Sequence, residues 1–234
     1  MRSSVRPHRS TDNALAATVV VCLTFVSACS KQPTATPPPA KKEISGVFVV
    51  DGNSWTQSRH GAVAVPENVW KQLGSPEHFR VVDEAESGVG MAQMIDPKHQ
   101  QRVDGHVVKG QSNVLLLWES CHDLAEGHSA EETAQRLRDY YQRRKAAGFA
   151  VVSLTLLPCC ADDWPADYAS KRDAVNKMIL ASPADYGDFV VDVTDLTGPD
   201  VFSPIDKVHL TDSSSTEVAK RVASVLRPVL LKQD

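Results

Sequence analysis

The chain has 234 residues, of which 42% are hydrophobic and 23% are charged, and its formal net charge is −4 at pH 7. This length suits one globular domain with additional terminal segments. The acidic balance and the lack of a basic stripe in the sequence argue against a nucleic-acid partner.

Residues 1–28 have the composition of an export signal. Three early arginines precede an apolar run from Ala14 to Ala28, which is short for a membrane span. The run ends Val26-Ser27-Ala28-Cys29, which resembles the lipobox of bacterial lipoproteins. The resemblance implies that Cys29 is lipidated and anchors an exported protein to the bacterial cell envelope, on the periplasmic or the outer surface. Plain secretion and an ordinary N-terminal anchor are the alternatives.

Residues 29–43 are rich in proline and small polar side chains, so they cannot bury a core. We expect an extended tether there, followed by one folded domain over residues 44–234.

The folded domain alternates strand-like and helix-like segments. Strands are predicted at residues 47–50, 79–82, 113–118, 149–157 and 189–193, and helices at 66–73, 129–147, 166–180 and from 214 onward. Capping boxes are predicted at Ser129 and Ser214, and Gly148 is predicted to end the second helix. This alternation indicates a parallel sheet of about five strands with helices on both faces, a three-layer α/β/α sandwich.

The first predicted strand runs into a polar turn, Asp51-Gly52-Asn53-Ser54. The carboxyl edge of a parallel sheet is where ligands bind in open α/β folds, so Ser54 lies where a nucleophile is expected. A serine that only caps the following helix is the alternative interpretation.

A base for this serine is found near the C-terminus, in Asp206-Lys207-Val208-His209. An imidazole activates a serine hydroxyl, and a carboxylate fixes the tautomer of the imidazole. Ser54, His209 and Asp206 therefore form a candidate triad, although a lone histidine is more often structural. Activity is expected to rise with pH as His209 loses its proton.

These motifs resemble those of the SGNH hydrolases, also called the GDSL esterase/lipase family. Gly52-Asn53-Ser54 stands for the family's Gly-Asp-Ser, with Asn53 in place of Asp, and Asp206-x-x-His209 matches its Asp-x-x-His. The resemblance spans roughly residues 47–230. It implies a flavodoxin-like three-layer fold, no cofactor, and hydrolysis of small-molecule or glycan esters, as by a carboxylesterase, thioesterase or carbohydrate O-deacetylase. An envelope acyltransferase and a non-catalytic binding lipoprotein are the alternatives.

The family also supplies oxyanion donors. The resemblance implies that the backbone N–H groups of Ser54 and Gly88, or of Gly90 instead, hold the oxyanion. The family's Gly-x-Asn-Asp corresponds to residues 120–123, so His122 stands where an asparagine donor is usual. A neutral imidazole N–H can donate to an oxyanion, and a purely structural histidine is the alternative.

Cys121 follows the third predicted strand, and Cys159 and Cys160 follow the fourth. Because neighbouring parallel strands end at the same edge, we expect a disulfide from Cys121 to one of the other two. A metal site formed by these cysteines with His122 is the competing interpretation, disfavoured because adjacent cysteines fit tetrahedral zinc poorly.

Three tryptophans lie near the predicted site or its strands. Trp55, Trp118 and Trp164 are candidates to line a substrate pocket, but large aromatic residues more often belong to the core. The core is the favoured interpretation for Trp118, which ends a predicted buried strand.

Overall fold

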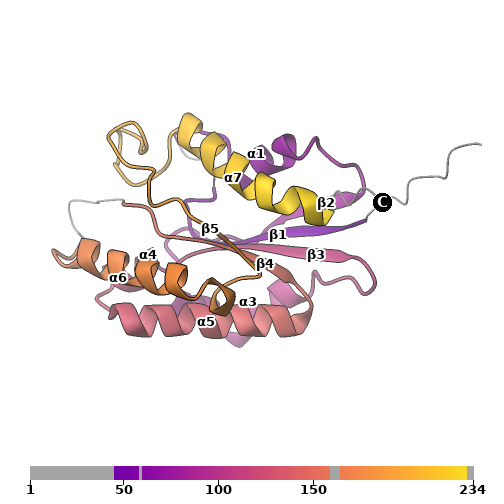
Figure 1. The fold of residues 1–234 in the computed structure, drawn as a ribbon, viewed down its shortest axis with the longest axis horizontal. Helices are drawn as coiled ribbons and strands as arrows, with labels where there is room; N and C mark the ends of the chain where they lie inside the picture. The colour runs from indigo at the N-terminus through magenta and orange to yellow at the C-terminus, as the bar shows by residue number, and fades with distance from the viewer. Residues whose placement is uncertain (1–44, 58–59, 159–163, 231–234) are drawn as a thin grey trace, which may run out of the picture. The chain divides into compact units, whose positions relative to one another are not determined.

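The computed structural model describes residues 45–57, 60–158 and 164–230 (Figure 1). The predicted signal and tether lie outside the described residues, as do Cys29, Cys159 and Cys160, so the predicted lipidation and disulfide stay predictions. Within the described ranges, no helix combines the length and the apolar character that crossing a membrane requires.

Five parallel strands form one sheet in the order β2-β1-β3-β4-β5. They are β1 (Gly46–Gly52), β2 (Phe79–Asp83), β3 (Ser112–Trp118), β4 (Ala150–Leu154) and β5 (Phe189–Val191). Every residue of β1 is buried, as expected for a central strand that is covered on both faces. The predicted parallel sheet is confirmed.

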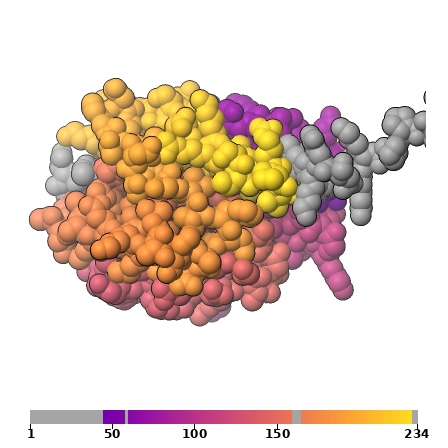
Figure 2. Space-filling view, in the orientation of Figure 1, coloured from indigo at the N-terminus to yellow at the C-terminus, as the bar shows by residue number. Residues whose placement is uncertain are grey.

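Helices cover both faces of the sheet. They are α1 (Val65–Gln72), α2 (Met91–Met94), α3 (Pro97–Asp104), α4 (Cys121–Ala125), α5 (Ala130–Ala147), α6 (Tyr168–Ala181) and α7 (Asp212–Leu230), with a 3-10 turn η1 (Pro183–Asp185). Figure 1 shows α1 and α7 on one side of the sheet and α3 to α6 on the other. In the space-filling view these layers largely hide the strands (Figure 2). The predicted three-layer α/β/α sandwich is therefore confirmed.

Several predicted boundaries are confirmed by the caps. The Ser129 hydroxyl accepts a hydrogen bond from the Glu132 backbone N–H at 3.1 Å, so α5 begins as predicted. Gly148 ends α5 in the left-handed conformation, with φ of 113°.

Other boundaries differ from the prediction. The last helix begins at Asp212 because the Thr211 hydroxyl accepts the Ser214 backbone N–H at 3.3 Å, so the predicted capping box at Ser214 is wrong. The short helices α2, α3 and α4 were not predicted, since segments of four to eight residues carry little periodic signal.

Candidate active site

Ser54, His209 and Asp206 form a continuous hydrogen-bonded relay. The Nε2 atom of His209 lies 2.9 Å from the Ser54 hydroxyl, and its Nδ1 atom lies 2.6 Å from Oδ2 of Asp206. With a proton on Nδ1 donated to the carboxylate, Nε2 presents a lone pair to the serine hydroxyl. The relay thus has the geometry of a nucleophile, a general base and an orienting acid.

A close strand contact and a tight turn place Ser54. The Asn53 backbone N–H donates to the Trp118 carbonyl at 3.3 Å, which holds the turn against the end of β3. A Cβ at Gly52 would lie 2.3 Å from that same carbonyl oxygen, so only glycine fits there. The Asn53 side-chain oxygen then accepts the Trp55 backbone N–H at 2.7 Å and closes the turn.

Helix capping is the wrong interpretation of Ser54. The first helix, α1, begins only at Val65, and its cap residue is Ala64. The serine side chain instead contacts the His209 ring. The turn therefore serves to present the hydroxyl at the carboxyl edge of the sheet.

The loop that carries Asp206 and His209 is held by its own backbone. The Ser203 N–H donates to the His209 carbonyl at 2.7 Å, and Lys207 takes a positive φ of 59° in the tight turn between Asp206 and His209. The indole N–H of Trp55 donates to the Val208 carbonyl at 3.1 Å, which ties this loop directly to the Ser54 turn.

The Asp206 carboxylate is strongly stabilised in its charged form. Burial raises the pKa of Asp206, but hydrogen bonds from the backbone and ring of His209 outweigh it and hold the pKa far below its usual range. The Val208 backbone N–H and the His60 ring contribute further bonds to the same carboxylate. Asp206 therefore remains an anion that orients the imidazole over the whole range in which histidine titrates.

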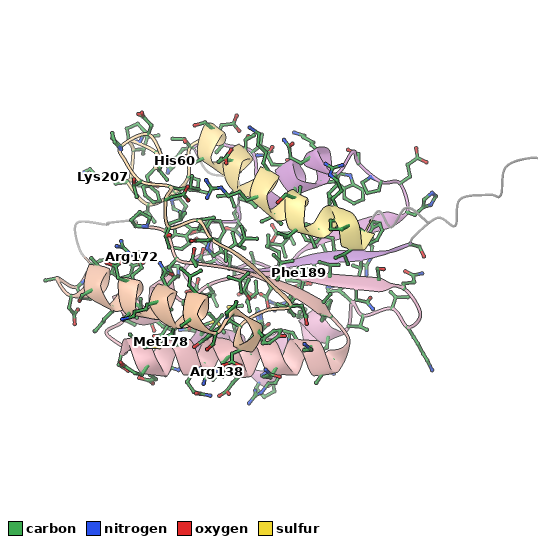
Figure 3. All side chains as sticks on the ribbon, in the orientation of Figure 1. His60, Arg138, Arg172, Met178, Phe189 and Lys207 are labelled. Carbon is green, nitrogen blue, oxygen red and sulfur yellow. The ribbon has the colours of Figure 1, made fainter. Side chains whose placement is uncertain are left out.

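His60 is a member of the site that the sequence did not indicate. Its Nε2 atom lies 2.5 Å from Oδ2 of Asp206, the oxygen that also accepts from His209. The two histidine rings meet edge to face, with centroids 5.7 Å apart. Figure 3 shows His60 and Lys207 at the same end of the fold. No motif singles out a histidine in the loop after the serine, which explains why it was missed.

The loop after β2 approaches His122. A Cβ at Gly90 would lie 3.3 Å from the Cβ of His122, and the Gly90 N–H donates to the Gln93 side chain at 3.0 Å. Because that bond engages the Gly90 N–H, Gly88 is the better candidate of the two for an oxyanion donor. Gly88 takes a positive φ of 76°, as glycine readily does in a tight turn.

A buried carboxylate, Glu119, joins this loop to the serine turn. Its side chain is fully excluded from solvent and accepts the Asn53 side-chain amide. It also accepts the His122 backbone N–H at 3.0 Å and lies 3.3 Å from the Nδ1 atom of the His122 ring. Sequence reasoning missed Glu119 because a glutamate directly after a strand is ordinarily exposed.

Glu119 alters the protonation of its neighbour. Burial lowers the pKa of His122, but the hydrogen bond to Glu119 and its negative charge outweigh burial and raise the pKa above the ordinary histidine value. Glu119 therefore shifts the equilibrium of the His122 ring toward its cationic form.

Among the residues that the structure describes, two triplets of side chains have potential ligand atoms within 4.8 Å of one another, namely His60 with Asp206 and His209, and Glu119 with Cys121 and His122. In both triplets these atoms already hydrogen-bond to one another, so we assign no metal ligand to either.

The tryptophans divide between core and loop contacts. Trp55 and Trp118 are buried and pack on each other with ring centroids 5.3 Å apart, so both belong to the core. Trp164 is partly buried and meets the Tyr168 ring edge to face at 4.4 Å.

Surface hollows of the described part of the chain include two that lie away from the relay. One, of about 370 Å³, is lined by the starts of β3 and β4 and by Lys145 and Asp188. The other, of about 390 Å³, lies between Trp70 on α1 and Val81 on β2. Neither hollow is lined by a residue of the Ser54–His209–Asp206 relay.

Solved structures of other proteins have a fold similar to that of this chain. No family model and no curated protein matches the sequence. Among solved structures, an SGNH hydrolase from Slackia heliotrinireducens superimposes with a TM-score of 0.58 at 19% identity, over 78% of this chain and 99% of that one. A carbohydrate esterase family 3 protein from Talaromyces cellulolyticus gives 0.61 at 14% identity, over 82% and 100%.

A lipase/acylhydrolase from Enterococcus faecalis also superimposes with a TM-score of 0.61, at 12% identity over 82% of this chain and 100% of that one. These alignments cover nearly all of each neighbour and about four fifths of this chain. The chain therefore has the fold of the SGNH hydrolases.

Proposed function

We propose that this chain is a serine ester hydrolase of the carboxylesterase or carbohydrate O-deacetylase type. The observation that carries the proposal is the unbroken relay, with 2.9 Å from Ser54 to His209 and 2.6 Å from His209 to Asp206. The three side chains come from opposite ends of the sequence, and a surface that only binds a ligand does not require this geometry.

In the first half of the reaction, His209 accepts the Ser54 proton as the hydroxyl oxygen attacks the ester carbonyl. Asp206 stabilises the imidazolium that forms. The backbone N–H groups of Ser54 and Gly88, together with His122, stabilise the oxyanion. His209 then protonates the leaving alcohol, which leaves an acyl group on the serine.

In the second half, water replaces the alcohol. His209 takes a proton from the water, which attacks the acyl-enzyme carbonyl, and then returns a proton to Ser54 as the acid departs.

The substrate class proposed is a small-molecule or glycan ester. Two of the fold neighbours are a carbohydrate esterase and a lipase/acylhydrolase, which supports an ester bond as the target without fixing the acyl or alcohol part.

The test is hydrolysis of p-nitrophenyl acetate and butyrate by the full-length chain beside its Ser54→Ala variant. We expect a rate above the buffer blank that Ser54→Ala abolishes. If wild type and variant both match the blank, a fluorophosphonate probe separates the remaining classes. Labelling of Ser54 would indicate an acyltransferase with a demanding acceptor, and no labelling would indicate a binding protein.

We also propose that the enzyme is exported and anchored to the bacterial cell envelope through a lipid on Cys29. The apolar run and the lipobox-like ending at Cys29 support this, together with the proline-rich tether that follows. Incorporation of labelled palmitate that Cys29→Ser abolishes is the expected result, and unlabelled wild type would contradict it.

A further inference from the structure

The two departures from the SGNH motifs, Asn53 and His122, meet at a single buried carboxylate. The Asn53 amide donates to Oε2 of Glu119. The His122 backbone N–H donates to Oε1 at 3.0 Å, and the Nδ1 atom of the ring lies 3.3 Å from each carboxylate oxygen. The substitutions are therefore parts of one structural unit and not independent losses.

The Glu119 charge requires a cation nearby. Its side chain is fully buried, and an unpaired buried carboxylate is strongly unfavourable. In the described part of the chain, its ion-pair partner is His122, and no lysine or arginine contacts it. The Asn53 amide donates a hydrogen bond to Glu119 but adds no charge, so the positive charge is left to the His122 ring.

Tautomer chemistry decides what this ring can do. A neutral His122 that donates its Nδ1 proton to Glu119 has only a lone pair on Nε2, and a lone pair repels an oxyanion. A protonated His122 donates through both nitrogens. The contact with Glu119 therefore makes His122 an oxyanion donor only when the ring carries a charge.

We propose that Glu119 and Asn53 are positioning residues that hold His122 as an imidazolium, and that the imidazolium donates its Nε2 proton to the oxyanion of the reaction. The proposal rests on the ester-hydrolase function above. It replaces the neutral asparagine donor of the family with a charged donor, for which a hydrogen bond is stronger.

Other charges near His122 agree with this assignment. Asp123 on α4 and Glu126 directly after it add negative charge, which favours the cation. Asp123 is itself paired with Arg136 from α5 and accepts the Met91 N–H from α2. The positive charge of Arg136 therefore partly offsets the effect of the Asp123 charge on the His122 ring.

The sulfur of Cys121 also lies beside the ring, with Sγ 3.5 Å from Nδ1. The Asn53 amide also contacts this sulfur, at 2.9 Å. Of the described residues that hydrogen-bond to the His122 ring, Glu119 is the one with a full negative charge, which is consistent with the raised pKa of His122.

A charged donor predicts a distinctive pH profile. The base His209 must be neutral, which limits the rate on the acid side, and His122 must be charged, which limits it on the alkaline side. Because Glu119 favours the charged form, its loss should move the alkaline limb to lower pH. An asparagine donor does not titrate and would give no such limb.

The experiment measures kcat/KM for p-nitrophenyl acetate from pH 5.5 to 9.5, with the full-length chain and Ser54→Ala as the blank. The kcat/KM of the wild type should fall at both the acid and the alkaline end of this pH range. In Glu119→Gln we expect the alkaline limb to move down by about one pH unit or more, since an adjacent opposite charge shifts a titration by that amount. The rate at neutral pH should fall about tenfold as the charged donor is depopulated.

A second variant guards against a folding defect. In Glu119→Gln/His122→Asn, the neutral family donor is restored without a buried charge, so activity at pH 7 should exceed that of Glu119→Gln and the alkaline limb should vanish. An alkaline limb that is unmoved in Glu119→Gln, or that persists in His122→Asn, would overturn the inference.

Direct observation of the ring separates this inference from the proposed function. NMR titration of the histidine Cε1–H signals, with His122→Asn for assignment, should show His122 titrating above the ordinary range in wild type and lower in Glu119→Gln. If the enzyme is active but His122 titrates in the ordinary histidine range, the charged-donor role of His122 is overturned and the proposed ester-hydrolase function is not. Wild type that hydrolyses no ester and has an unlabelled Ser54 would overturn the proposed function and the donor role with it.

Discussion

The side chain of Asn53 connects the Ser54 turn to the buried carboxylate of Glu119. Its oxygen accepts the Trp55 backbone N–H at 2.7 Å, and its nitrogen donates to Oε2 of Glu119. An aspartate has no N–H to donate, so the usual family residue would place two carboxylates in contact at this position. Asn53 thus provides an N–H donor to the buried Glu119 carboxylate, which an aspartate could not do.

This relationship predicts that Asn53→Asp destabilises the protein even though it restores the family motif. Two buried carboxylates cannot both ionise, so we expect the free energy of unfolding at pH 7 to fall by about 1 to 3 kcal/mol. Urea unfolding measures the change. The difference from wild type should shrink as the pH falls and one carboxyl group is protonated, and an undiminished stability at pH 7 would contradict the contact.

Loss of the orienting carboxylate should be far more costly to catalysis than to stability. In Asp206→Asn the imidazole loses the partner that fixes its tautomer, so we expect kcat to drop on the order of 10³- to 10⁴-fold. Steady-state kinetics with p-nitrophenyl butyrate and thermal unfolding of the same samples check both parts. A drop of less than tenfold would show that Asp206 does not orient His209.

His60 should have a smaller effect than either partner in the relay. It shares Oδ2 of Asp206 with His209, but its side chain is 30% exposed, so solvent can replace its hydrogen bond. We expect His60→Gln to lower kcat/KM by about two- to tenfold. His106→Gln is the control, because that histidine contacts Glu84 away from the relay. Equal effects of the two variants would deny His60 a positioning role.

A fourth prediction concerns acid stability. Burial raises the pKa of Asp188, but hydrogen bonds from Lys145 and from the Val151 backbone outweigh it and lower the pKa. A lowered carboxyl pKa contributes stability that is present above the unfolded value, about 3.9, and is lost as the pH falls through the folded value.

Asp188→Asn should therefore reduce the free energy of unfolding by about 1 to 2 kcal/mol at pH 7 and by much less near pH 3. Urea unfolding at the two pH values measures this, with the exposed Asp139→Asn as control. An equal loss at both pH values would mean that the charge of Asp188 is not what stabilises the fold.

The sequence alone was sufficient for the sheet and the relay. Buried strands such as residues 47–50 carry continuous apolar runs, and Ser54, Asp206 and His209 lie in short motifs with fixed spacing. These features are local in sequence, and they predict the sheet edge at which the three side chains meet.

The polar contacts inside the fold could not be predicted in the same way. Asp51 is fully buried, accepts the Tyr140 hydroxyl and lies 3.0 Å from the His99 ring, yet in the sequence it is one more acidic residue in a turn. Glu119 and His60 were missed for the same reason. Their partners are distant in sequence, and single-sequence patterns do not encode such pairs.

Covalent capture of Ser54 shows whether this serine is an activated nucleophile. The full-length chain is treated with a fluorophosphonate near neutral pH, and the modified residue is located by peptide mass spectrometry, with His209→Ala as a comparison. We predict one equivalent of probe on Ser54 in wild type and little reaction in His209→Ala. No labelling of Ser54 in folded wild type, or equal labelling of both proteins, would contradict the account.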